Sequence, residues 1–258
     1  MAIYSHSQLS TYETCPLQYK FNYIDKIRRE EQGIEAFMGN CFHETMALLY
    51  KDLNFSIHAV DELLSYYDER WDKEYSDKVI IVKKNKTVDD YRSIGKKCIQ
   101  DYYKSYHPFD QAKVLGIERQ VNFDLDEEGR YKLKGYIDRI DLTGDGTYEI
   151  HDYKTSGFLP EQSQADKDRQ LALYEIGLRK MWNDADRVRL VWHYVVFDKE
   201  LSSARTDEDL NKLKSDTISL INEIEKVKEF KPKESYLCGW CSYKRFCPKK
   251  KHLVKVTG

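Results

Sequence analysis

Alternating hydrophobic and polar positions in the middle of the chain predict a group of β-strands. Residues 131–154 contain two strand-like runs that flank a cluster of Thr, Gly and Asp at positions 143–147. Such a cluster favours a tight turn with positive φ, so we expect a β-hairpin. Residues 112–126 are expected to form a strand that leads into the hairpin. Residues 188–198 are rich in β-branched and aromatic side chains, which is typical of a buried strand.

Hydrophobic residues at helical spacing predict helices before and after these strands. The predicted helices cover residues 7–27 with a break at Cys15-Pro16, then 36–52, two pieces within 57–106, 166–182 and 207–230. This order of strands and helices predicts an α/β fold in which a mixed central sheet is flanked by helices.

The composition is that of one large globular domain. The chain has 258 residues, of which 41% are hydrophobic and 33% are charged. No apolar run approaches the roughly 20 residues that span a membrane, and no basic segment followed by an apolar one is visible at the start. We therefore expect a cytoplasmic protein without membrane association. The formal net charge is −2, so binding to nucleic acid would require basic residues concentrated at one place.

The predicted hairpin carries two carboxylates and one amine. Asp152 and Lys154 are two positions apart on one strand, so their side chains share a face about 7 Å apart at the backbone. Asp138 lies on the partner strand and can meet them. Carboxylates bind hard divalent ions, which polarise a phosphate and activate a water, and a lysine stabilises developing negative charge or helps to deprotonate the water. Solvated ion pairs on strand faces have the same composition, so this pattern alone leaves both interpretations open.

Two residues outside the hairpin also have a structural and a functional interpretation. Glu118 is a possible further acidic ligand, although a strand glutamate is more commonly part of an ion pair. His43, on the predicted helix 36–52, is by itself more typical of a structural histidine than of a ligand.

The C-terminal cysteines have the spacing of a metal site. Cys238, Cys241 and Cys247 follow the pattern C-x2-C-x5-C, and a site of this kind needs a fourth ligand. Cys15 is the best candidate, because it would join the N-terminal helices to the C-terminus. Zinc and an iron–sulfur cluster both accept four thiolates, and the spacing does not distinguish them. Cys41 and Cys98 have no partners at ligand spacing and are interpreted as structural.

Together these motifs resemble a known family. Gly135-Tyr-Ile-Asp138 and Asp152-Tyr-Lys154 resemble the core of the PD-(D/E)xK nuclease superfamily. Tyr12-x-x-Cys15-Pro16 with the three C-terminal cysteines resembles its iron–sulfur exonucleases, which include RecB-like exonucleases, AddB-type nuclease domains and the CRISPR-associated nucleases called Cas-four. Gly39 with His43, and Gln170 with Tyr174, match two further motifs of that group, and all appear in family order from about residue 5 to 248.

The resemblance implies roles for these residues. It implies a restriction-endonuclease-like sheet, catalysis by Asp138, Asp152 and Lys154, and a Mg²⁺ or Mn²⁺ ion bound by His43, Asp138, Asp152 and the carbonyl of Tyr153. It also implies a 4Fe-4S cluster on Cys15, Cys238, Cys241 and Cys247, with zinc as the alternative. Gln170 and Tyr174 would hold the substrate strand or orient Lys154. The family often has Glu where this chain has Asp152.

The expected function is a metal-dependent DNA nuclease, acting as an exonuclease on single-stranded DNA in repair, recombination or CRISPR spacer processing, with possible protein partners from such a complex. We expect one domain over 1–258, with a helical insertion at about 53–110 and an iron–sulfur subdomain formed by about 5–30 and 232–258. The basic residues at 244–245 and 249–251 either contact phosphates or form a solvated tail. A non-catalytic subunit that binds DNA ends and a redox-sensing regulator are the alternatives.

Overall fold

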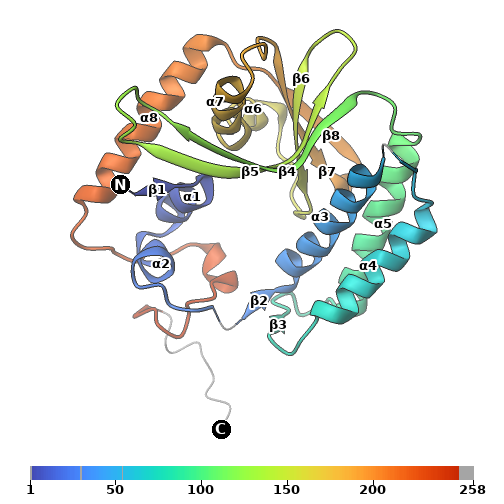
Figure 1. Ribbon diagram of the computed structural model, residues 1–258. Helices are drawn as coiled ribbons and strands as arrows, with labels where there is room; N and C mark the ends of the chain where they lie inside the picture. The colour runs from blue at the N-terminus through green and yellow to red at the C-terminus, as the bar shows by residue number, and fades with distance from the viewer. Residues whose placement is uncertain (1, 30, 54, 250–258) are drawn as a thin grey trace.

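The fold is built on a mixed six-stranded sheet. The structure is a computed structural model that describes residues 2–29, 31–53 and 55–249 (Figure 1). The strands follow the order β1-β5-β6-β7-β8, and β4 pairs with β5. Their bounds are β1 Ile3–Tyr4, β4 Lys113–Asp124, β5 Lys132–Leu142, β6 Tyr148–Lys154, β7 Val188–Tyr194 and β8 Lys199–Ser203. Parallel pairing of β6 with β7 and antiparallel pairing of β4, β5 and β6 confirm the predicted mixed sheet.

The predicted hairpin is present as β5 and β6. Their pairing runs from Leu142 opposite Tyr148 to Arg139 opposite His151. In the turn, Gly146 donates its N–H to the carbonyl of Thr143 at 3.0 Å. Gly146 has a φ of +80°, a conformation that side chains disfavour, which explains the glycine there.

Helices pack on the sheet in two groups. The helices α7 (Gln170–Met181), α8 (Asp207–Lys226) and α1 (His6–Thr14) share one hydrophobic core with β4, β5 and β7. A second core joins α3 (Ile34–Asp52), α4 (Val60–Glu74) and α5 (Val88–Tyr106), and it includes Tyr153 of β6. Figure 1 shows α6 to α8 on one side of the long β4–β5 ribbon and α3 to α5 grouped apart from them.

The predicted helical region 57–106 contains α4 and α5, and their polar contacts explain its charge pattern. Thr87 caps α5: its hydroxyl accepts from the N–H of Asp90, whose carboxylate accepts from the N–H of Thr87 at 2.7 Å. Arg92 of α5 pairs with Asp68 at 2.7 Å and with Asp72 at 2.6 Å on α4. These charges fasten two helices and form no cluster of catalytic groups. The short strands β2 (Gln32–Gly33) and β3 (Val79–Ile80) connect this region to the start of α3.

The C-terminal segment of the described chain lies against the helical segment that follows α1. The predicted break at Cys15-Pro16 separates α1 from α2 (Pro16–Tyr19), which continues as a π-helical turn, η1 (Lys20–Ile24). Tyr243 is 1% exposed, and its hydroxyl donates to the side chain of Asn22 at 2.8 Å. Residues 236–249, which begin with the turn η3 (Tyr236–Trp240), are thereby held against α2 and η1, as Figure 1 shows.

The shortest elements are those that the sequence did not predict. They are β1, β2, β3, β8, the helix α6 (Gln162–Ala165) and the 3-10 turn η2 (Val195–Phe197). Segments of two to five residues have too little periodicity to stand out. Helix α7 begins at Gln170 and not at 166, because the N–H of Gln170 is capped by the Asp168 carboxylate at 2.8 Å. No helix in the described ranges is long and apolar enough to cross a bilayer.

Candidate active site

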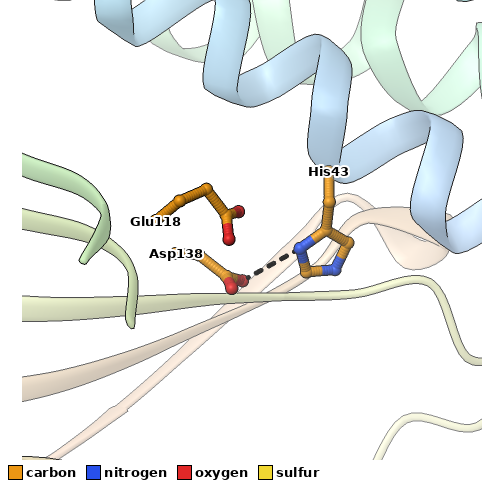
Figure 2. Close-up of side chains that lie close together, drawn as sticks. All are labelled: His43, Glu118 and Asp138. Carbon is orange, nitrogen blue, oxygen red and sulfur yellow. Dashed lines mark ion pairs between the residues drawn. The ribbon is translucent and has the colours of Figure 1, made fainter. Parts of the chain in front are cut away.

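A histidine and two carboxylates converge where α3 meets the β4–β5 ribbon. The ligand atoms of His43, Glu118 and Asp138 all lie within 4.8 Å of one another. His43 Nδ1 is 3.2 Å from Asp138 Oδ2, and Figure 2 shows the three side chains pointing toward a common space. One imidazole and two carboxylates are ligands that suit Mg²⁺ or Mn²⁺.

The backbone of β6 holds two of these ligands. The N–H of Tyr153 donates to Asp138 Oδ2 at 2.8 Å, and the carbonyl of the same residue lies 2.9 Å from His43 Nε2. Helix α3 reaches β6 because residue 39 is glycine: a Cβ there would lie 2.8 Å from Thr155 Oγ1. The pairing of Gly39 with His43 in the sequence therefore has a packing reason, since the glycine permits the approach that brings the histidine to the strand.

Asp152 and Lys154 form the adjoining half of the site. Lys154 Nζ is 2.7 Å from Asp152 Oδ2, and it donates to Gln170 Oε1 at 2.7 Å. Gln170 Nε2 donates to Asp152 Oδ1 at 2.8 Å, so the amide holds both members of the pair. Asp152 is 5% exposed and does not belong to the group formed by His43, Glu118 and Asp138. The predicted residues thus come together as two adjoining sets.

The electrostatics of the site favour a bound cation. Burial raises the pKa of the Asp152 carboxyl and the nearby Asp138 raises it further, against the opposing effect of Lys154. Burial and Asp138 also raise the pKa of Glu118. Burial would lower the pKa of His43, but its hydrogen bond to Asp138 and the surrounding carboxylates outweigh this and raise it to about 9. In the metal-free site, protonated His43 therefore balances part of the negative charge of the surrounding carboxylates. A divalent ion can balance the same charge when it is bound.

The comparison with known protein families decides the family. The model of the PD-(D/E)XK nuclease superfamily matches residues 3–248 of this chain. The chain belongs to the PD-(D/E)XK nuclease superfamily. This confirms the predicted family and the predicted mixed sheet flanked by helices. Enzymes of this superfamily are in general metal-dependent hydrolases, and the acidic group around Asp138 agrees with that chemistry.

A solved structure shares this fold. The crystal structure of a candidate exonuclease from Eubacterium rectale is 11% identical, over 99% of this chain and 90% of that one, with a TM-score of 0.51. The crystal structure of SSO0001 is 16% identical, over 83% of this chain and 97% of that one, with a TM-score of 0.37. No curated protein matches the sequence.

Glu118 lies in the candidate metal group with His43 and Asp138, although a strand glutamate is more commonly part of an ion pair. The register of β4 and β5 places it opposite Asp138, between the pairs Ile117–Arg139 and Arg119–Ile137. Its φ of +47° is unusual for a residue other than glycine and marks a local distortion of the strand. The less favoured of its two interpretations, a further acidic ligand, is the one that its position supports. Only the strand register reveals this, because glutamates on strands are common.

Tyr174, predicted to hold the substrate strand or to orient Lys154, is buried at 8% exposure. It packs against β5, where a Cβ on Gly135 would lie 2.2 Å from its ring. Burial and then Asp152 raise the pKa of Tyr174 to about 12, while Lys154 and a hydrogen bond with Gln170 act in the opposite direction. This position favours orientation of Gln170, and through it Lys154, over contact with a substrate.

The four predicted cysteines also come together. Cys15, Cys238, Cys241 and Cys247 line one cavity beside Lys233 and Ser235. The backbone N–H of Lys233 lies 3.4 Å from Cys15 Sγ, and that of Ser235 lies 3.5 Å from Cys238 Sγ. Burial raises the pKa of the Cys241 thiol, a backbone hydrogen bond from Tyr243 lowers it, and the other three cysteines raise it. Among these described sulfur atoms, no three lie within 4.8 Å of one another.

A second buried acidic cluster has a structural explanation. The ligand atoms of Asp141, Glu149 and His151, which lie on β5 and β6, are within 4.8 Å of one another. Arg139 Nε donates to Asp141 at 2.9 Å, and Arg189 Nε donates to Glu149 at 2.8 Å. Two guanidinium groups already balance the two carboxylates. We therefore interpret this cluster as an ion network that supports the sheet behind the site.

Proposed function

We propose that this protein is a metal-dependent deoxyribonuclease that degrades single-stranded DNA from an end. The proposal rests above all on one observation: the group of His43, Glu118 and Asp138 adjoins the pair of Asp152 and Lys154 in a nuclease-superfamily fold. The candidate exonuclease from Eubacterium rectale, which shares the fold, agrees with an exonuclease activity.

His43, Asp138, Asp152 and the carbonyl of Tyr153 would hold the ion, and Glu118 adds a further carboxylate. These residues fit a divalent cation, because the charges of Glu118, Asp138 and Asp152 are only partly balanced by His43 and Lys154. When bound, the ion polarises the scissile phosphate and lowers the pKa of a coordinated water. His43 must release the proton that it shares with Asp138 or with Tyr153 before it can act as a ligand.

Lys154 acts as a cation in this scheme. Burial lowers its pKa, but the charge and hydrogen bond of Asp152 more than offset this and raise it. A lysine that stays protonated stabilises the negative charge that develops on the phosphate, and it is a poor base for water. Gln170 fixes its direction through the hydrogen bond to Nζ.

A groove leads to the metal group. It has a volume of about 650 Å³ between α3 and the first half of β4, and Tyr50, Gly116 and Glu118 are among its lining residues. A DNA strand that lies in this groove reaches the carboxylates at its end. On β4, the groove is lined by residues that precede Glu118. The DNA strand would therefore leave the site over the β4 residues that follow Glu118.

In our proposal the four cysteines hold a 4Fe-4S cluster, and zinc is the alternative. Four thiolates around one zinc ion at 2.3 Å would lie about 3.8 Å apart, whereas the thiolates of a four-iron cluster bind different iron atoms and lie farther apart. No three of these described sulfur atoms lie within 4.8 Å of one another, which supports the wider arrangement, and backbone N–H groups point toward two of them. In our proposal the cluster fastens residues 5–30 to residues 232–249 and supports the DNA passage. The resemblance extends the proposal to DNA repair, recombination or CRISPR spacer processing with protein partners.

The test is an incubation of the anaerobically purified protein with end-labelled single-stranded DNA and Mn²⁺, with and without EDTA. We expect mononucleotides or short products that EDTA abolishes, and no cleavage by Asp152→Ala or Lys154→Ala. A DNA complex without cleavage in any metal would support the binding subunit and contradict the enzyme.

A further inference from the structure

One aromatic side chain lies exposed on the sheet beside the metal group. Tyr136 of β5 is 56% exposed, and it precedes Asp138 by two residues. Leu133, Gly135 and Ile137, which alternate with it, are buried. The alternation therefore places Tyr136 on the outer face of the ribbon, about 7 Å from Asp138 along the strand.

Among the residues within 2–249 that the structure describes, no side chain pairs with the ring of Tyr136. Among the described residues, neither its hydroxyl nor its ring takes part in a hydrogen bond or an aromatic contact. Other exposed aromatic residues of the described chain, such as Phe55 and Trp240, lie in loops or helical turns, and Tyr136 alone lies in a strand. A strand holds the ring far more firmly than a loop does. An exposed ring on a rigid strand is suited to a planar ligand.

The neighbours of Tyr136 are polar. Strand register places Gln120 opposite Tyr136 and Asn122 opposite Lys134, and all four residues are exposed. These residues follow Glu118 along β4, whereas the groove between α3 and β4 precedes it. The outer face of the ribbon therefore continues the path of the groove past the metal group. It offers one ring, one ammonium group and two amides.

We infer that Tyr136 is a positioning residue on which the nucleobase next to the scissile phosphate stacks, with Lys134 contacting the following phosphate. Bases stack on aromatic side chains with little regard to sequence, because every base presents a π-face. A base held about 7 Å from Asp138 is one nucleotide away from the metal group. This inference rests on the proposed function, since it assigns the position of that enzyme's substrate.

The experiment pairs a side-chain deletion with a base deletion. Tyr136→Ala, Tyr136→Phe and wild type are compared on one single-stranded oligonucleotide and on copies in which one nucleotide lacks its base, scanned along the strand. For wild type we expect one abasic position, next to the bond being cut, to reduce kcat/KM about tenfold. Tyr136→Ala should be about tenfold slower on intact DNA and insensitive to the base at that position, and Tyr136→Phe should behave as wild type.

The control variant is Phe55→Ala, which removes an aromatic ring of 90% exposure beyond the end of α3 and should change neither rate nor base dependence. Equal abasic penalties in wild type and Tyr136→Ala would overturn the inference while leaving the nuclease intact. Equilibrium binding of the same oligonucleotides, with Ca²⁺ in place of Mn²⁺, tests base stacking on Tyr136 separately from nuclease activity. If wild type does not cleave DNA, the proposed function fails. Equal affinity of wild type and Tyr136→Ala for intact DNA would then also overturn the stacking.

Discussion

The side-chain oxygen of Gln170 accepts a hydrogen bond from Lys154 Nζ at 2.7 Å, across the interface between α7 and β6. The nitrogen of the same amide donates to Asp152 Oδ1 at 2.8 Å. A single side chain thus fixes both members of the Asp-x-Lys pair. The helix therefore adds two hydrogen bonds to the ion pair that Asp152 and Lys154 already form at 2.7 Å.

Gln170→Ala tests this arrangement. The loss of both hydrogen bonds frees Lys154, so we expect kcat to fall about tenfold to a hundredfold with KM changed less than threefold. Steady-state kinetics on single-stranded DNA measure the two constants. Gln162→Ala is the control, because the Gln162 side chain donates to Asp166 and Ser202, away from the site. A change confined to KM would show that Gln170 binds substrate and does not orient Lys154.

The metal group predicts a ranking of ligands. Asp138→Asn should abolish Mn²⁺ binding, because Asp138 is placed by both His43 and the N–H of Tyr153. Glu118→Gln should weaken binding about tenfold, because the loss of one carboxylate still leaves two others and the histidine. Isothermal titration calorimetry measures both affinities. Glu127→Gln, an exposed change in the loop between β4 and β5, should leave the affinity as it is. Wild-type affinity in Glu118→Gln would remove Glu118 from the ligand set.

The metal-free protein should lose stability as the pH rises. His43 has a pKa raised to about 9 in the folded state, against 6.5 without its surroundings. Between these values the folded state holds a proton that the unfolded state has released, so its contribution is complete below pH 6.5 and disappears as the pH passes 9. Urea denaturation in EDTA at pH 6, 7.5 and 9 measures the change.

The matching variant for this pH dependence is His43→Asn, whose stability should vary less across the same window. Subtraction of the two curves removes the contributions of other titrating groups to the pH dependence. One such group is Glu175, whose pKa burial raises to about 7 against the opposing charge of Arg179. Parallel curves for wild type and His43→Asn would contradict the raised pKa. Mn²⁺ should stabilise wild type more at pH 9 than at pH 6, since the metal competes with the proton on the imidazole.

The cysteine site predicts a visible cofactor. Anaerobic wild-type protein should be brown with about four iron atoms per chain, and Cys15→Ser should lose the colour and melt at a lower temperature. Cys98→Ser is the matched control: Cys98 is 3% exposed in the α3–α5 core, and its loss should leave the iron content unchanged. Colourless wild-type protein with one zinc ion would overturn the cluster and favour the alternative metal.

The sequence identifies chemistry that is local in the chain and misses chemistry that depends on register. The turn at 143–147 is encoded by its own residues, and Gly146 has the expected positive φ. The pairing of Asp152 with Lys154 follows from alternation on one strand. In contrast, Glu118 meets Asp138 only because a shift in register between Val114 and Gly116 sets how β4 lies against β5. The exposure of Tyr136 likewise depends on which face of the ribbon the helices cover.

The same limit applies to short elements. β1 has two residues and is held by pairing with Lys132 and Leu133 of β5, not by any preference of its own. The four cysteines show the opposite case, a long-range contact that the sequence predicted from their spacing. Cys15 reaches the others across more than 200 positions because the contact between Tyr243 and Asn22 holds the two segments together. The cysteine spacing predicts that Cys15 meets the other three cysteines, and tertiary packing brings them together.

Gly135 connects the sequence motif to packing and predicts a stability change. A methyl group at this position would lie 2.2 Å from the ring of Tyr174, so Gly135→Ala must displace the ring and α7 with it. We expect a loss of about 1–3 kcal/mol in the free energy of unfolding, measured by urea denaturation, together with reduced activity because Tyr174 supports Gln170. Gly144→Ala, with nothing within 4 Å of its added Cβ, should cost far less. In the double variant Gly135→Ala/Tyr174→Leu the smaller side chain relieves the clash. The loss of stability in the double variant should therefore be smaller than the sum of the losses in the two single variants. Strictly additive losses would show that the clash is not what makes glycine necessary at this position.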